Sequence, residues 1–347
     1  MCWRIVAYLA ISLLLLVGCS SPPHLSGYLY AFSNNNFTVV DLNTGKIIAN
    51  AVGPKTVSFL YAAKIDDRTI LLSGFEARPN GRSVSVKLDH RTVRFVSGGA
   101  AIWLYNRFTG ELTPYLLSPR YPFLGIPVYM PKYKSMIFYC GKNRLCRAPA
   151  DDTGNVIVAD PNDADDDGLG GWGYYPIVAV SDDEVLYITN NDRVKYYNLA
   201  TDKVGYLPFG KCVPQLWRSK TQQLLCLAFQ PKAHYYFIKL DGTEKARAPN
   251  FDDGTPAIYL PDYDTVIAGG LQLKWYFPDP IPYEWSILRA YNLTSGSVHA
   301  FASGSWMSQG DTAWFPDVPK DIPGITLAEP TQITATPLAT LPNAIGK

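Results

Sequence analysis

The sequence predicts an all-β fold built as one ring of repeated four-stranded units, and three observations lead to this prediction. Proline and glycine, 27 of each among 347 residues, separate short runs of β-branched and aromatic residues. After the amino-terminal segment, no long stretch shows the 3.6-residue hydrophobic period of a helix. Two types of hairpin alternate along the chain, with six copies of each.

The first type of hairpin has a turn rich in Asp, Asn, Thr and Gly. Asn and Asp side chains cap the backbone of a tight turn and Gly adopts positive φ, so these residues are typical of hairpin tips. The copies begin at Phe37 (FTVVDLNTGKII), Ala101 (AIWLYNRFTGELTPYL), Arg144 (RLCRAPADDTGNVIV), Arg193 (RVKYYNLATDKVGYL), Tyr235 (YYFIKLDGTEKARA) and Ile287 (ILRAYNLTSGSVHAF).

The second type joins two apolar strands through a turn that contains Pro, or Ser and Asp. The copies begin at Tyr61 (YAAKIDDRTILLSG), Tyr129 (YMPKYKSMIFY), Ala179 (AVSDDEVLYIT), Leu216 (LWRSKTQQLLCLA), Tyr259 (YLPDYDTVIAG) and Trp314 (WFPDVPKD). The last copy is truncated. One hairpin of each type together supplies four strands per unit.

The spacing of these copies predicts a β-propeller. Five steps lead from Gly45 to Gly296 over 251 residues, close to the fifty residues of a four-stranded blade. The chain begins with the later strands of a blade and ends with a first-strand copy, so its last strand is expected to complete the first blade and hide its edge. We expect six blades, or seven if the 65-residue step from Gly45 to Gly110 contains another.

The excess in that step is the segment from Phe75 to Gly99, which we interpret as a long protruding hairpin with a turn at Asn80-Gly81. Its cations make it locally basic: Arg78, Arg82, Lys87, Arg91 and Arg94. Such a hairpin suits an acidic partner or lipid headgroups. The alternative is that these cations are solvated and block sheet-to-sheet association.

The turns also resemble those of known propellers. The Pro-Asp turns resemble the strand turns of Tol-associated periplasmic propellers and WD-repeat-like proteins, and VVDLNTGKII resembles the repeat of envelope propellers with a DxxTGK tip. The resemblance covers 27–321, the expected propeller domain, and leaves 322–347 as a Pro/Thr-rich tail, disordered or loosely draped. Quinone-dependent propellers carry Trp four residues after the Thr-Gly glycine, where this chain has Ala49 and Pro114. That family and its cofactor are therefore disfavoured.

The amino terminus indicates an anchor. Arg4 precedes an apolar run from Ile5 to Val17, which is too short to span a bilayer comfortably. The sequence around Cys19 (LVGCSS) resembles the lipobox of bacterial lipoproteins, which implies a signal peptide at 1–18, acylation of Cys19 and a tether at 19–26. Ser20 fits outer-membrane sorting. The expected location is the bacterial cell envelope, lipid-anchored at the outer membrane and facing the periplasm; an ordinary signal peptide or short membrane anchor is the alternative.

The charge balance gives no sign of a polyanionic partner. Removal of the expected signal peptide takes away one cation and no acid, so 31 minus 1 leaves 30 Lys plus Arg against 30 Asp plus Glu. A neutral mature chain gives no reason to expect nucleic acid as a partner.

Four further cysteines suit disulfides in an oxidising compartment. They allow three pairings, and we expect the local ones, Cys140 with Cys146 and Cys212 with Cys226, because each pair flanks an apparent hairpin. Neither pair has the spacing of zinc ligands.

An aromatic hairpin tip is the first candidate binding site. The segment LQLKWYFPDPIPYEWS from Leu271 places aromatic residues around a proline-stiffened turn, and such rings suit a sugar or a protein groove. The candidate residues are Trp275, Tyr276, Phe277, Tyr283 and Trp285. The alternative is that these rings fold back on a blade.

The segment DPNDADDDGLGGWG from Asp160 to Gly173 is the second candidate. Asp163, Asp165 and Asp167 followed by Gly168 match the start of a calcium loop, so a structural calcium ion between two blades is one hypothesis. The position of the closing Glu is Tyr174, so Asp160 or Asn162 would have to complete the shell. A solvated loop between blades is the alternative, and the acids exclude a phosphate-binding glycine loop.

These observations favour a binding or scaffolding module whose partner is an envelope protein or glycan. The four histidines are spread along the chain, and no HExxH or GxSxG motif occurs, so no catalytic residue is assigned. The competing hypothesis is a propeller enzyme, a sugar or lactone hydrolase or lyase, with a metal at one mouth of the central channel.

Overall fold

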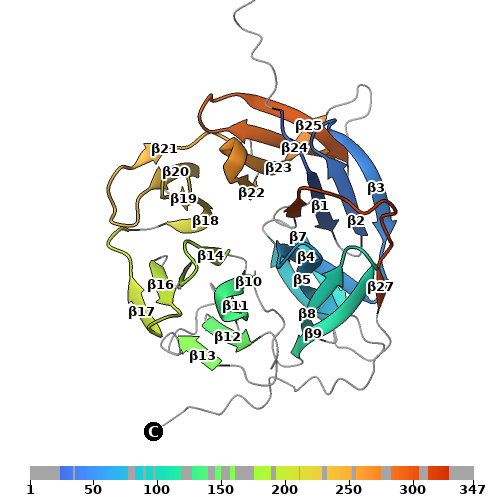
Figure 1. Ribbon diagram of the computed structural model, residues 1–347, viewed down its shortest axis with the longest axis horizontal. Helices are drawn as coiled ribbons and strands as arrows, with labels where there is room; N and C mark the ends of the chain where they lie inside the picture. Colours follow the sequence, from blue (N-terminus) through green and yellow to red (C-terminus); the bar gives the residue numbers. More distant parts are fainter. Residues whose placement is uncertain are drawn as a thin grey trace, which may run out of the picture.

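The computed structural model shows six β-sheets arranged around one axis as the blades of a propeller (Figure 1). It describes residues 24–33, 36–76, 83–88, 91–96, 99–118, 127–139, 145–149, 157–160, 176–188, 193–210, 212–228, 233–251, 255–274, 283–304 and 312–327. Within these ranges the only helical elements are two 3-10 turns, η1 (Pro131–Tyr133) and η2 (Pro261–Tyr263). None of these segments forms a helix long and apolar enough to cross a membrane. The predicted all-β, six-bladed fold is confirmed.

Each blade is an antiparallel sheet of four strands, which are named below from the inner to the outer strand. Blade 1 contains β26 (Thr312–Phe315), β1 (Tyr28–Ser33), β2 (Asn36–Asp41) and β3 (Lys46–Val52). Blade 2 contains β4 (Val57–Lys64), β5 (Thr69–Glu76), β8 (Gly99–Asn106) and β9 (Glu111–Ser118). Blade 3 contains β10 (Val128–Met130), β11 (Ser135–Tyr139), β12 (Leu145–Pro149) and β13 (Ile157–Asp160).

Blades 4 to 6 repeat the same order. Blade 4 contains β14 (Val178–Ala179), β15 (Glu184–Ile188), β16 (Val194–Asn198) and β17 (Lys203–Tyr206). Blade 5 contains β18 (Val213–Arg218), β19 (Gln223–Ala228), β20 (His234–Ile238) and β21 (Ala246–Arg247). Blade 6 contains β22 (Thr255–Leu260), β23 (Thr265–Lys274), β24 (Tyr283–Asn292) and β25 (Val298–Gly304).

The ring closes through blade 1, as predicted. β26, from the carboxyl-terminal part of the chain, pairs with β1 from Tyr28 opposite Phe315 to Ala31 opposite Thr312. A fifth strand, β27 (Thr326–Leu327), lies outside β9 in parallel and joins blade 2. The segment between Asp321 and Leu327, which follows the expected end of the propeller, thus contributes to a blade. The first described strand, β1, and the last two, β26 and β27, thus lie in the neighbouring blades 1 and 2.

The two ends of the ring differ. Every complete copy of the two predicted hairpins connects an inner strand to a second strand or a third strand to an outer strand, so these turns share one end, which we call the turn face; the truncated copy at Trp314 supplies the inner strand β26 alone. The hairpins between second and third strands and the connections between blades belong to the opposite end, which we call the loop face.

The turns form for local reasons. In blade 1, Asp41 accepts hydrogen bonds from the Asn43 N–H and the Thr44 hydroxyl, both at 2.9 Å, and Gly45 follows at φ +67°. The Pro-containing turns begin a 3-10 turn at Pro131 or Pro261 and end with Lys134 or Asp264 in the left-handed region.

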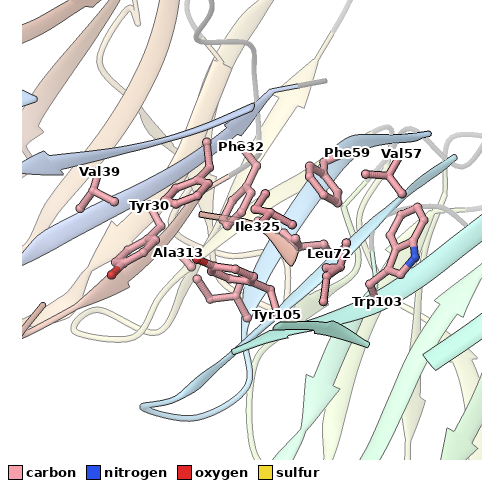
Figure 2. Close-up of a cluster of buried hydrophobic side chains, with 14 of the residues drawn as sticks. Tyr30, Phe32, Val39, Val57, Phe59, Leu72, Trp103, Tyr105, Ala313 and Ile325 are labelled. Carbon is pink, nitrogen blue, oxygen red and sulfur yellow. The ribbon is translucent and has the colours of Figure 1, made fainter. Parts of the chain in front are cut away.

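The core lies between neighbouring blades. Apolar side chains on the two faces of each blade pack against the blade on either side, and aromatic rings dominate the contact between blades 1 and 2 (Figure 2). There the Phe59 ring meets the edges of Phe32 and Trp103 at centroid distances of 5.9 and 5.7 Å. Gly74 in β5 is required, because a Cβ would lie 1.9 Å from the Ser58 carbonyl oxygen.

The long step in blade 2 is an inserted hairpin and not a seventh blade. β6 (Ser83–Leu88) and β7 (Arg91–Val96) pair only with each other, between β5 and β8. Leu88 pairs with Arg91, so the reversal within this hairpin falls between these two residues. The predicted turn at Asn80-Gly81 lies outside the described residues and is not the reversal that joins β6 to β7.

Candidate functional site

The loop face carries a hairpin that is longer than a blade needs. β23 and β24 pair over ten residues each, from Thr265 opposite Asn292 to Lys274 opposite Tyr283. The equivalent strands of blades 3 to 5 have five or six residues. At about 3.3 Å per residue, the extra pairs carry this hairpin roughly 15 Å beyond those of blades 3 to 5.

The predicted aromatic tip belongs to this hairpin. Tyr283 and Trp285 lie in β24, opposite Lys274 and Gln272. Trp275, Tyr276 and Phe277 follow the end of β23 directly and lie outside the described residues. The strand pairing confirms the long hairpin, whereas its role in binding stays a prediction.

The inserted β6–β7 hairpin leaves blade 2 at the same face. Three of the predicted basic residues belong to it: Arg91 lies opposite Leu88, Arg94 opposite Ser85, and Lys87 opposite Thr92. Arg78 and Arg82 lie outside the described residues. This hairpin and the extended end of β23–β24, two additions to the four-stranded blades, thus lie at the same end of the ring.

The aspartate-rich loop connects blades 3 and 4, as expected from the repeats. Asp163, Asp165 and Asp167 lie outside the described residues, so the calcium hypothesis stays a prediction. Within the described ranges, no group of three or more His, Cys, Asp or Glu side chains is placed to hold a metal ion.

Asp160, at the start of that loop, has a structural role that the sequence did not reveal. Its carboxylate is buried and accepts hydrogen bonds from the Tyr187 hydroxyl at 2.6 Å and from Lys195 Nζ at 2.7 Å. Both partners belong to blade 4, so this ion pair joins it to blade 3. Because one oxygen already receives these two donors, Asp160 is a poor candidate to complete a calcium shell.

One of the two expected disulfides is fully described. Cys212, just before β18, is joined to Cys226 in β19, with a Cα–Cα distance of 5.2 Å. Cys146, in β12, is disulfide-bonded as well, and Cys140 lies outside the described residues. Blades 3 and 5 therefore each contain a cross-linked cysteine.

The turn face is held by ion pairs between blades, and Asp264 forms the most extensive one. This buried carboxylate, in the blade 6 turn, accepts hydrogen bonds from Arg218 Nε at 2.8 Å and Nη2 at 2.5 Å. Tyr259 and Thr294 donate to it as well, at 3.0 and 2.6 Å. Burial by itself would raise the pKa of Asp264, but the hydrogen bonds from Arg218, Thr294 and Tyr259 outweigh it and lower the pKa to about 2.

A second ion pair joins blades 3 and 4. Asp183 accepts hydrogen bonds from Lys132 Nζ at 2.6 Å and from the Tyr133 hydroxyl. These hydrogen bonds hold the pKa of Asp183 below its ordinary value. Lys132 remains half exposed, so this pair contributes less than the Asp264 cluster.

The third charged group is Arg107, whose side chain is completely buried. Its Nε donates to the Asp67 carbonyl at 2.5 Å, and Nη1 and Nη2 donate to the Asp317 carbonyl and carboxylate at 3.0 and 2.5 Å. The rings of Phe108 and Phe315 lie 4.5 and 4.4 Å from the guanidinium carbon. Burial raises the pKa of the nearby Tyr30 above its ordinary value.

Sequence reasoning missed Arg107, although the repeats contain a signal for it. In four blades, the residue after the third strand donates its backbone N–H to a carbonyl just before the second strand of the same blade, which shows that the four positions are equivalent. These residues are Leu42, Arg107, Leu199 and Leu293. Three blades place leucine there and blade 2 places arginine. A charged residue at a repeat position for an apolar one indicates a special contact.

In the described part of the chain, three carboxylates stabilise contacts between neighbouring blades. Asp160, Asp183 and Asp264 are each neutralised by a cation from a neighbouring blade. A carboxylate held in this way is a poor general acid or base, since it keeps its charge and its donors. These ion pairs thus link blade 3 to blade 4 and blade 5 to blade 6.

Comparisons with known proteins support the fold. No protein-family model matches the sequence, and no curated protein matches it. The structure is similar to TolB from Acinetobacter baumannii, with 14% identity, a TM-score of 0.56, and 87% of this chain and 69% of that chain covered.

Two further solved structures resemble it more weakly. One is a putative TolB from Agrobacterium tumefaciens, with 11% identity, a TM-score of 0.49, and 84% of this chain and 99% of that chain covered. The other is an oligogalacturonate lyase in complex with manganese, with 12% identity, a TM-score of 0.42, and coverage of 80% and 74%. At the level of fold, the resemblance to Tol-associated propellers inferred from the turns is confirmed.

Proposed function

We propose that this protein is a lipid-anchored β-propeller of the bacterial cell envelope that binds an envelope protein or glycan through its loop face. The observation that carries the proposal is the placement of two additions, the β6–β7 hairpin and the extended end of β23–β24, at the same end of the ring. Binding residues are commonly placed on loops held by a rigid scaffold.

The chemistry of the longer hairpin suits recognition. The segment between its two strands has the sequence WYFPDPIP from Trp275, which combines aromatic residues with three prolines. Aromatic rings offer large apolar faces with polar edges, and prolines reduce the entropy lost when a loop is ordered on binding. A tip of this kind suits a groove on a protein or the face of a sugar ring.

The path of the amino terminus supports an orientation in which this face is free. Leu25 is buried, the Ser26 hydroxyl lies 2.5 Å from that of Tyr263, and the Trp314 indole N–H donates to the Ser26 carbonyl. These contacts lie at the turn face. With a lipid on Cys19, residues 19–23 span at most about 18 Å, which brings the turn face close to the membrane and directs the loop face away from it.

Affinity capture from detergent-solubilised envelopes tests the proposal. The bait is the full lipidated chain, compared with a W275A/Y276A/F277A variant and with a control that carries Asp262→Ala on the turn face. We expect the tip variant to lose the captured partner and the control to retain it. Protease or glycosidase treatment of the envelopes before capture identifies the class of partner. Equal capture by all three baits would contradict binding through the loop face.

The anchor has its own test. Mass spectrometry of the mature protein is expected to find an acylated Cys19 at the amino terminus, and Cys19→Ala is expected to release the protein from the membrane fraction. An unmodified mature terminus elsewhere in the chain would contradict the anchor while leaving the binding proposal open to the capture experiment.

A further inference from the structure

The segment from Pro316 to Leu327, which we call the strap, crosses the turn face after β26 and ends as β27 on the outer edge of blade 2 (Figure 1). Besides the pairing of β27 with β9, hydrogen bonds to its second half run from the Thr326 N–H to the Gly110 carbonyl at 2.8 Å and from the Tyr105 hydroxyl to the Pro323 carbonyl at 3.3 Å. Gly110 permits this close approach, because a Cβ there would lie 2.1 Å from the Gly324 carbonyl oxygen.

The first half of the strap covers Arg107. Asp317 supplies two of the three hydrogen-bond acceptors of the guanidinium, and Phe315, just before the strap, supplies one of its two ring contacts. Arg107 is completely buried, whereas the Asp317 side chain is 64% exposed. The strap therefore brings the counter-charge to a cation that blade 2 alone does not neutralise.

This arrangement makes the strap and the arginine depend on each other. A buried guanidinium without its carboxylate is strongly unfavourable, whereas an apolar side chain of similar size in the same place is often neutral or stabilising. If the strap leaves, Arg107 regains water, which offsets part of the lost contacts. The strap itself pairs over only two residues of β9.

We infer that Pro316–Leu327 is a charge-locked strap, which stays on the propeller while Asp317 neutralises the buried Arg107 and is released when that carboxylate is lost. Release uncovers the junction of blades 1 and 2, where Ile325 and Tyr105 are buried, and frees the outer edge of β9. An exposed strand edge is a surface to which another strand can add. The strap thus acts as a conformational device that closes the seam of the ring.

Limited trypsin digestion of the full chain tests the lock, because Lys320 lies exposed on the strap. The readout is the rate at which the carboxyl-terminal fragment starting at Asp321 appears, measured by mass spectrometry, while Trp fluorescence monitors the blades. We compare wild type, Asp317→Ala, Arg107→Met, the double variant, and Asp262→Ala, which removes an exposed acid from the blade 6 turn.

We expect Asp317→Ala to accelerate this cleavage roughly tenfold or more, and Arg107→Met and the double variant to stay within about twofold of wild type. Asp262→Ala is expected to leave the rate unchanged. A rate for Asp317→Ala equal to that of Asp262→Ala would overturn the inference. Fast cleavage of the double variant would overturn it too, since the lock requires that removal of the buried cation restores the strap. If Asp317→Ala does not fold, Asp317→Asn in both backgrounds provides the same comparison.

Discussion

Replacement of Asp264 by asparagine removes the charge at the centre of the largest ion-pair cluster and keeps the shape of the side chain. Asn tolerates the left-handed backbone conformation found there, φ +45°, so the turn itself is not expected to change. Arg218, whose side chain is 15% exposed, loses its counter-charge. Breaking a buried pair of this kind costs about 3–5 kcal/mol, and we expect a value near the lower end because Arg218 retains some solvent contact.

The pKa of Asp264 predicts how this loss depends on pH. A carboxyl whose pKa falls from 3.8 to about 2 on folding gains about 2.5 kcal/mol from ionisation. Because the folded pKa is the lower one, this contribution is complete above pH 4 to 5 and is lost as the pH falls towards 2. The stability difference between wild type and Asp264→Asn is therefore expected to shrink by about 1 kcal/mol between pH 7 and pH 3.

Urea unfolding followed by Trp fluorescence at pH 7, 5 and 3 measures this difference. Asp262→Asn is the matched control, because this exposed acid lies two residues away in the same turn. We expect the control to stay within about 0.5 kcal/mol of wild type at every pH. If Asp264→Asn is as stable as the control at pH 7, or if its deficit is the same at pH 3, the reasoning about this cluster is refuted.

Three further predictions concern the seam, the disulfide and the buried lysine. Gly110→Ala places a Cβ only 2.1 Å from the Gly324 carbonyl oxygen of the strap, so the strap has to shift. We expect hydrogen exchange of the strap amides to accelerate at least tenfold. Unchanged exchange would show that the strap tolerates the side chain. Cys226→Ser, which breaks the bond to Cys212, is expected to lower the free energy of unfolding by about 3 kcal/mol, as measured in urea, and an unchanged midpoint would contradict this. Asp160→Asn leaves Lys195 buried without its counter-charge and is expected to cost about 3 kcal/mol or more, while the double replacement with Lys195→Met recovers much of it; additive losses in the double variant would argue against the pair.

The parts of the fold that rest on local patterns could be predicted from the sequence. Each hairpin tip is specified by residues a few positions apart, such as Asp41 and Gly45, and the spacing of the tips set the number of blades. The pairing of Cys212 with Cys226 followed from the same hairpins. Closure through Trp314 followed from the type of strand at each end of the chain.

The contacts between blades could not be predicted in the same way. Arg107 and Asp317 lie 210 positions apart, and Arg218 and Asp264 lie 46 apart, so no local pattern links the partners. β27 consists of only two residues and pairs in parallel, which gives it no periodic signature. Such contacts depend on how neighbouring blades meet, and a single sequence does not show this.

Site-specific photo-crosslinking in intact cells distinguishes the two faces of the ring as binding surfaces. A photoreactive residue replaces Tyr276 at the loop-face tip in one variant and Lys134 at the turn face in another, each in the full chain with its signal sequence. Binding through the loop face predicts a discrete crosslinked envelope partner from position 276 and none from position 134. A partner captured from position 134 alone would contradict it, since the binding surface would then lie on the face assigned to the membrane side.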